Sequence, residues 1–192
     1  MLELAVLGLL HESPLHGYEL RQRLKATLGT FRAFSYGSLY PSLRRMRDAG
    51  WIAEDDGDAE VVAGAPALTG RRGKVVYKLT AEGKERFAEM LTEAGPAAWE
   101  DETFGVHFAF FARTDPEVRV RILEGRRSRL EERREGVRSS LTRTRSRLDR
   151  YTLQLQEHGL ESVEREVRWL TELIETERRD TAGPASDTPT HP

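Results

Sequence analysis

Apolar residues near the start of the chain recur at helical spacing and predict two successive helices. Residues 1–12 carry apolar side chains at i, i+3 and i+4 positions, and further leucines make this helix apolar nearly all round. We expect Pro14 to end it, because the residue before a proline avoids the helical region. A second helix is expected over residues 16–28, with three leucines on one side and basic residues on the other. The first helix should therefore be buried on several sides.

A third helix is expected to end at Gly50, and it has the most informative pattern. Its buried stripe consists of Leu39, Leu43 and Met46. With Ser38 as the N-cap, Pro41 falls in the first turn, where its missing N–H has no helical partner anyway. The opposite side carries hydroxyl groups near its start and the guanidinium groups of Arg44 and Arg45. Such a helix buries one face and offers hydrogen-bond donors on the other.

Two short strands and a fourth helix are expected next. Residues 51–53 predict one strand, and residues 74–79 alternate apolar and basic side chains like its partner. A long loop joins them, and Thr80 is expected to cap a helix over residues 80–93. This order of elements predicts a winged helix-turn-helix, in which the third helix enters the major groove of DNA and the strand pair reaches the backbone or the minor groove. The fold class is therefore mainly α with a small β-wing.

The second half of the chain predicts two antiparallel helices. Apolar residues recur at sevens from Leu123, with a second stripe offset by four, until His158-Gly159 is expected to break the helix. Another apolar stripe continues to about Arg179. Periodicity alone leaves two interpretations of these stripes equally open, a core within one chain and the seam of a homodimer. The predicted dimerisation residues are Leu123, Leu130, Val137, Leu141, Leu148, Val163, Val167, Leu170 and Ile174.

Bulk charge argues against a nucleic-acid partner, whereas the distribution of charge argues for one. The 192 residues hold 30 Lys+Arg against 32 Asp+Glu, a formal net charge of -2. Residues 20–51, however, hold seven bases and one acid, residues 52–60 hold five acids and no base, and residues 70–78 hold four bases and no acid. The helix-turn-helix and the second wing strand are thus basic, and the start of the wing loop is acidic.

Several chemistries find no support in the sequence. The absence of cysteine excludes a disulfide scaffold, cysteine-ligated zinc and a thiol nucleophile. His11 and His16 lack a second cluster at metal-ligand spacing, and no nucleophile elbow or P-loop is present. No apolar run is long enough to cross a bilayer, and the start lacks the basic region of a signal peptide. We therefore expect a cytoplasmic protein that is not an enzyme, with no metal and no cofactor.

Four motifs resemble those of the PadR family of bacterial transcriptional regulators, and together they cover roughly residues 1–90. They are His16-Gly-Tyr-Glu-Leu20, Gly37-Ser-Leu-Tyr-Pro-Ser-Leu43, Gly50-Trp-Ile52 and Tyr77-Lys-Leu-Thr-Ala-Glu-Gly83. The later Phe104–Phe111 segment and the long Arg/Glu-rich helices resemble the subgroup with an extended C-terminal dimerisation domain. The chain departs from the family pattern at Arg47, at Trp51 and in the unusually long wing loop of residues 55–70.

The resemblance implies a homodimeric repressor that binds double-stranded DNA and releases it when a small molecule is sensed. The implied DNA-binding residues are Tyr18, Ser38, Tyr40, Pro41, Arg44, Arg45, Arg71, Arg72 and Lys74. A two-fold dimer would place its recognition helices about 34–36 Å apart, which implies a palindromic operator. A winged-helix module that binds proteins instead of DNA is the alternative function.

An aromatic cluster in the second half offers a candidate effector pocket, since ligand sites are largely apolar with a few polar groups. Core packing is the alternative role for such a cluster. The candidate pocket residues are Trp99, Phe104, His107, Phe108, Phe111 and Trp169. The predicted organisation is a DNA-binding domain over residues 1–95, a helical dimerisation and effector domain over residues 96–180, and a disordered tail over residues 181–192.

Overall fold

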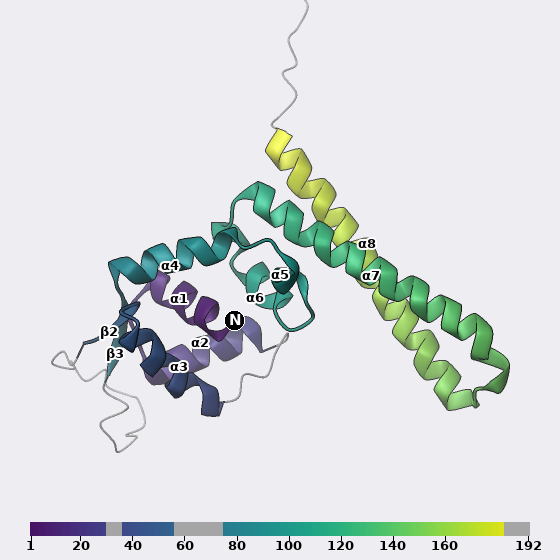
Figure 1. Ribbon diagram of the computed structural model, residues 1–192, viewed down its shortest axis with the longest axis horizontal. Coiled ribbons are helices and arrows are strands. Elements are labelled where there is room, and N and C mark those ends of the chain that lie inside the picture. Colours follow the sequence, from purple (N-terminus) through teal and green to yellow (C-terminus); the bar gives the residue numbers. More distant parts are fainter. Residues whose placement is uncertain (30–35, 56–74, 183–192) are drawn as a thin grey trace, which may run out of the picture. The chain divides into compact units, whose positions relative to one another are not determined.

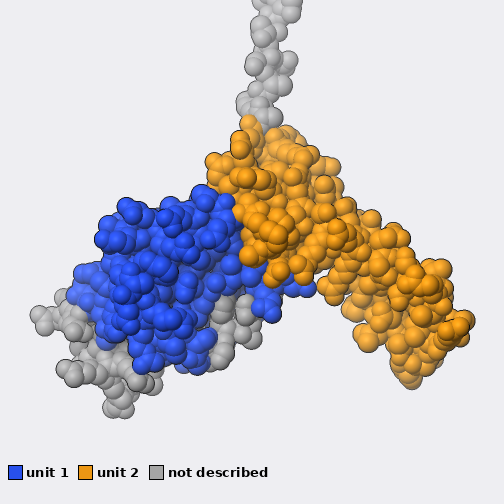
Figure 2. Space-filling model, viewed as in Figure 1, with its two compact units in different colours: residues 1–93, 101–114 blue, residues 94–100, 115–192 orange. Residues whose placement is uncertain are grey.

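The computed structural model describes residues 1–29, 36–55 and 75–182 (Figure 1). The chain forms two compact units, each coloured separately in Figure 2. Unit 1 comprises residues 1–93 and 101–114, and unit 2 comprises residues 94–100 and 115–192. Within the described ranges, every helix is too short or too polar to span a lipid bilayer.

Four helices build most of unit 1. They are α1 (Leu2–Glu12), α2 (Gly17–Leu28), α3 (Tyr36–Asp48) and α4 (Ala81–Thr92). Helix α1 contacts α2, α3 and α4, and every residue from Leu4 to Leu10 is buried (Figure 1). Its apolar character all round, which predicted burial on several sides, is explained by this central position.

Three short strands of the described residues form an antiparallel sheet in the order β1-β3-β2. Strand β1 spans Leu15–His16, β2 spans Ile52–Asp55 and β3 spans Val76–Leu79. The pair β2–β3 confirms the predicted wing, with Ile52 opposite Leu79. The sequence analysis missed β1, because two residues are too few to show a period of two.

The end of α3 sets the direction of the wing. Gly50 has a φ of 78°, and its N–H donates to the carbonyl oxygen of Arg47, while the N–H of Trp51 donates to that of Met46. These two bonds form a Schellman motif, which requires a left-handed residue that glycine adopts without steric cost. The Thr80 hydroxyl then accepts from the N–H of Gly83, as predicted for the cap of α4.

The start of α3 differs from the prediction. The helix begins at Tyr36, so Ser38 is not its N-cap and Pro41 lies inside the helix. Inside the helix, Pro41 cannot donate to the carbonyl oxygen of Gly37, and its ring crowds that carbonyl group. Leu39 and Leu43, on either side of it, are both buried, and we attribute the persistence of the helix through Pro41 to this burial.

Successive parts of residues 94–115 belong to different units. Helix α5 (Pro96–Trp99) belongs to unit 2, whereas α6 (Phe104–Ala109) and the following 3-10 turn (Phe111–Arg113) belong to unit 1. The physical reason lies in two glycines. Trp99 packs onto Gly125, and Phe110 packs onto Gly8, each so closely that a β-carbon at the glycine would overlap the ring. The compact units therefore do not divide at the single predicted boundary after residue 95.

Unit 2 is a hairpin of two long helices, α7 (Pro116–Thr144) and α8 (Arg150–Ala182), that lie side by side (Figure 1). The chain turns through a 3-10 turn at Arg145–Arg147, so the predicted break at His158-Gly159 is wrong. Asp149 starts α8, because its carboxylate accepts from the N–H groups of Tyr151 and Thr152. Gly159 continues the helix at a cost of about 1 kcal/mol relative to alanine, which a helix of this length tolerates.

Candidate nucleic-acid interface

Helix α3 is held in unit 1 by one apolar side. Leu39, Leu43 and Met46 are buried, as their spacing predicted. Ser42, which lies at the edge of this stripe, is also fully buried, and its hydroxyl donates to the sulfur of Met46 at 3.9 Å. Ser42 therefore belongs to the core rather than to the polar side of the helix. This anchoring leaves the other side of α3 to face outward.

The outward side of α3 carries unpaired positive charge. Arg44 and Arg45 are exposed, and neither forms an ion pair with another residue in the described part of the chain. Ser38 is exposed about two turns earlier, and Pro41, between Ser38 and the arginines, is half-buried. Guanidinium groups with five N–H donors suit phosphate oxygens and the major-groove edge of guanine. This side can therefore bind an anionic or guanine-containing partner.

Two tyrosines extend the same surface onto α2. Tyr18 is 41% exposed and Tyr40 is 37% exposed. A β-carbon at Gly17 would lie 3.6 Å from Cε1 of Tyr40, so the start of α3 contacts the residue that precedes Tyr18. The structure thus brings the start of α2 close to Tyr40 of α3 within unit 1, and Arg44 follows Tyr40 by about one turn of α3.

Arg47 differs from the other two arginines of α3 because it is neutralised locally. Its guanidinium donates to Asp48 and, at 3.1 Å, to Glu54 of β2. The hydrogen bond to Asp48 and the charge of Glu54 raise the pKa of Arg47. Arg47 therefore links α3 to the wing instead of adding a free charge to the outward side.

The wing is described only at its base. Arg71, Arg72 and Lys74, which the sequence analysis assigned to DNA, lie outside the described residues. At the base, Lys78 of β3 pairs with Asp55 of β2 at 2.9 Å. The guanidinium of Arg86 also lies over the ring of Trp51, 5.5 Å from its centre. These contacts fix the base of the wing against α4.

The candidate effector residues are divided between the two units. In unit 1, Phe108 contacts Phe104 and Phe111, with ring centres 5.7 and 4.9 Å apart respectively. His107 is only 3% exposed, and its Nε2 has no hydrogen-bond partner among the described residues. Burial lowers the pKa of His107 to about 4, so its imidazole is neutral at pH 7.

The two tryptophans of this set lie in unit 2. Trp99 packs against Gly125 of α7, and its carbonyl oxygen accepts from Arg126 at 3.2 Å. Trp169, on α8, is partly exposed. Trp99 is half-buried, and its ring packs α5 onto α7.

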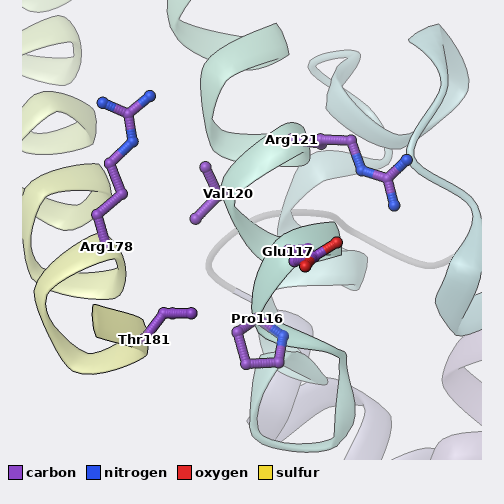
Figure 3. Close-up of a pocket in the computed structure, with 6 residues that line it drawn as sticks. All are labelled: Pro116, Glu117, Val120, Arg121, Arg178 and Thr181. Atoms are coloured by element: carbon purple, nitrogen blue, oxygen red, sulfur yellow. The ribbon is translucent and has the colours of Figure 1, made fainter. Parts of the chain in front are cut away.

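A separate cleft of about 540 Å³ lies between the beginning of α7 and the end of α8 (Figure 3). Val120 and Thr181 point into the space between these helices, whereas Arg121 points away from α8 (Figure 3). The lining residues are Pro116, Glu117, Val120, Arg121, Arg178 and Thr181. None of the predicted effector residues lines this cleft.

The predicted dimerisation residues occupy two kinds of position within one chain. Six are buried in unit 2, namely Leu123, Leu130, Val163, Val167, Leu170 and Ile174. Val137, Leu141 and Leu148 are half-buried, and Leu148 lies in the turn rather than in a helix. The apolar stripes therefore serve the packing of α7 on α8. Their role between two copies of the chain stays a prediction.

Sequence reasoning missed two polar contacts that involve functional or buried residues. Gln22 donates from Nε2 to the hydroxyl oxygen of Tyr18 at 2.7 Å. Arg126 is buried and donates to Glu166 at 2.8 Å, across the two helices of unit 2. The spacing of four residues between Tyr18 and Gln22 was a visible signal for the first contact. The second joins residues 40 positions apart, for which the sequence offered no signal.

The arrangement of α1 to α4 with the β2–β3 wing defines the class of the N-terminal part, which is a winged helix-turn-helix domain. Residues 6–89 match the family described as the transcriptional regulator PadR-like family. This match covers less than half of the chain, and it confirms the resemblance seen in the motifs of that segment. The family comprises transcriptional regulators rather than enzymes.

Individual proteins are also similar to this chain. The negative transcriptional regulator PadR of Bacillus subtilis (strain 168) is 29% identical over 96 residues, which are 50% of this chain and 48% of that protein. The chain thus matches about half the length of that curated relative. A crystal structure of Bacillus subtilis PadR in complex with operator DNA has 21% identity and a TM-score of 0.41, covering 92% of this chain and 98% of that chain. A crystal structure of the same regulator in complex with p-coumaric acid has 20% identity and a TM-score of 0.41, with the same coverage.

Proposed function

We propose that this chain is a transcriptional repressor that binds a specific double-stranded DNA sequence through α3. One observation carries the proposal: α3 buries one side in unit 1 and presents Arg44 and Arg45, exposed and unpaired in the described part of the chain, on the other. Tyr18 and Tyr40 supply hydroxyl groups beside them. Arginines of this kind read guanine or contact phosphate, and hydroxyl groups contact phosphate. The undescribed Arg71, Arg72 and Lys74 are proposed to contact the DNA backbone.

The experiment that tests this function is a titration of the full chain against the DNA upstream of its own gene in rising salt. Binding to phosphates releases counterions, so the logarithm of the affinity should fall linearly with the logarithm of the salt concentration. Binding with a flat salt dependence, or no binding to this DNA, would overturn the proposal. The latter result would favour the protein-interaction alternative.

We further propose that the repressor acts as a homodimer through unit 2. Large apolar side chains stay exposed on α8 although the stripes between α7 and α8 are filled, with Tyr151 79% and Leu155 67% exposed. A second copy that covers this face would remove them from water. A two-fold dimer with two α3 helices would bind an inverted repeat whose half-sites are one helical turn apart.

The dimer has a direct test in solution. Leu155→Arg places a charge on the exposed apolar face, and light scattering should then detect a monomer where the parent chain is a dimer. The matched control is Gln154→Arg, which adds the same charge at the neighbouring exposed position and should leave the dimer intact. A parent chain that is monomeric at micromolar concentration would contradict the proposed assembly.

Release by a small molecule completes the proposed function. The phenylalanine cluster around Phe108 supports an apolar effector site. The neighbouring His107 adds one polar group, because its buried Nε2 has no hydrogen-bond partner among the described residues. A screen of apolar aromatic compounds should find ones that raise the melting temperature of the chain and dissociate it from DNA. A compound that does both in the parent chain should lose both effects in Phe108→Ala. If every DNA-releasing compound acts equally on that variant, the effector site lies elsewhere.

A further inference from the structure

The hydroxyl group of Tyr18 has a defined partner within the protein. Gln22 follows Tyr18 by one helical turn on the exposed side of α2, and its Nε2 donates to the Tyr18 oxygen at 2.7 Å. This length is short for an amide donor and a phenol acceptor. The bond occupies one acceptor position of the Tyr18 oxygen.

The direction of this bond decides what Tyr18 can do next. A tyrosine hydroxyl has one proton to donate. Because Gln22 acts as the donor, the Tyr18 proton is not used in their contact and points to another acceptor. Tyr18 is 41% exposed, and it follows Gly17, at which a β-carbon would lie 3.6 Å from Cε1 of Tyr40 on α3. The proton is thus available at an exposed position of α2, next to a residue that lies close to α3.

A phosphodiester oxygen accepts hydrogen bonds and donates none. A tyrosine hydroxyl can therefore contact DNA phosphate only as a donor, with its proton directed outward. Donation by Gln22 selects that orientation before DNA arrives, and it also polarises the hydroxyl, because linked hydrogen bonds strengthen one another. Without this partner, the hydroxyl group would lose its rotational freedom only when DNA binds, and this loss would lower the affinity.

We propose that Gln22 is a positioning residue for the DNA contact of Tyr18: it holds the Tyr18 oxygen as an acceptor so that the hydroxyl proton is directed at a DNA phosphate. This inference rests on the proposed function and adds a residue that none of the family motifs in this chain includes. Gln22 itself needs no contact with DNA. Its effect on affinity should pass entirely through the Tyr18 hydroxyl.

A double-mutant cycle on the full chain tests this dependence. Gln22→Met keeps the length and the helix propensity of the side chain but removes the amide, and Tyr18→Phe removes the hydroxyl. We expect Gln22→Met to weaken binding to the upstream DNA about threefold to tenfold, the range of one neutral hydrogen bond. In the Tyr18→Phe background the same substitution should change the affinity by less than about 1.5-fold, within the usual error of additivity.

Gln22→Glu supplies the opposite hydrogen bond. A carboxylate only accepts, so it takes the Tyr18 proton and leaves none for phosphate. Its negative charge also repels DNA, and the Tyr18→Phe background measures that charge effect alone. The expected loss of affinity is therefore larger in the chain that has Tyr18 than in the Tyr18→Phe chain. Equal losses in the two backgrounds would overturn the inference.

The outcomes separate the inference from the function on which it rests. If the parent chain does not bind the DNA, the proposed function fails. If the parent binds and Gln22→Met has the same effect with and without the Tyr18 hydroxyl, only the positioning role fails. A purely structural role of Gln22 would lower the melting temperature and weaken binding equally in both backgrounds, whereas the positioning role leaves the melting temperature within about 2 °C of the parent, because an i, i+4 pair contributes only a few tenths of a kcal/mol.

Discussion

Two glycines with opposite backbone geometry should respond in opposite ways to the same substitution. Gly159 lies inside α8, and a β-carbon built there meets no atom within 4 Å. Alanine favours a helix interior by about 0.8–1.0 kcal/mol over glycine, so Gly159→Ala should stabilise the chain by about that amount. Gly50 also has open space for a β-carbon, but its φ of 78° is left-handed. Gly50→Ala should therefore destabilise the chain by about 1–2 kcal/mol.

The assay is urea unfolding of the full chain, followed by circular dichroism at 222 nm. Gly136→Ala is the control, because Gly136 is a second helical glycine with open space, in α7, and should respond like Gly159. The sequence pattern had placed a helix break at His158-Gly159, where a terminal glycine would adopt a positive φ. Destabilisation by Gly159→Ala of the size found for Gly50→Ala would thus refute the continuous α8 and return the turn of the hairpin to that position.

Three further predictions concern single contacts. Burial lowers the pKa of His107 to about 4, so between pH 6.5 and 4 the unfolded chain protonates this imidazole and the folded chain does not. The free energy of unfolding should therefore fall by up to about 3 kcal/mol as the pH is lowered through this window. His107→Leu should remove that part of the pH dependence. Glu166→Leu removes the carboxylate that pairs with the buried guanidinium of Arg126 at 2.8 Å and should cost about 2 kcal/mol in urea unfolding, against less than about 0.5 kcal/mol for the exposed Glu161→Leu. Equal costs for the two substitutions would show that the Arg126–Glu166 pair adds no more stability than an exposed one. Thr80→Ala removes the cap of α4 and should lower stability by about 1 kcal/mol, and an unchanged urea midpoint would contradict the capping bond.

Local patterns in the sequence were sufficient for most of unit 1. The all-round apolar start gave the buried α1, the stripe from Leu39 to Met46 gave the orientation of α3, and Thr80 gave the start of α4. Each of these features depends on residues within a few positions of one another. The pairing of β1 with β3 places Leu15 opposite Tyr77, and a two-residue strand is too short for its sequence to predict such a distant partner.

The errors arose where a local rule met a stronger tertiary contact. The preference of proline for the first turn of a helix placed the N-cap of α3 at Ser38. The helix instead begins at Tyr36, and leucines on both sides of Pro41 are buried. A glycine rule broke the second half at Gly159, but Asp149 caps a helix that begins nine residues earlier. The candidate DNA surface was identified in outline from the motifs. The spacing of Tyr18 and Gln22 allows their contact, but the direction of the hydrogen bond between them required atomic positions.

The central claim is that α3 reads a DNA sequence, and the most direct measurement is the ratio of affinities for the upstream DNA and for a shuffled duplex of the same length and composition. At physiological salt the account predicts a ratio of about 10³ or more for the parent chain. Arg44→Ala should lower this ratio by a factor of about 5 to 150, the range for loss of a base contact. Arg168→Ala, which removes an exposed arginine from unit 2, should leave the ratio unchanged. A ratio near one for the parent chain, or equal ratios for the parent and Arg44→Ala, would contradict sequence recognition by α3.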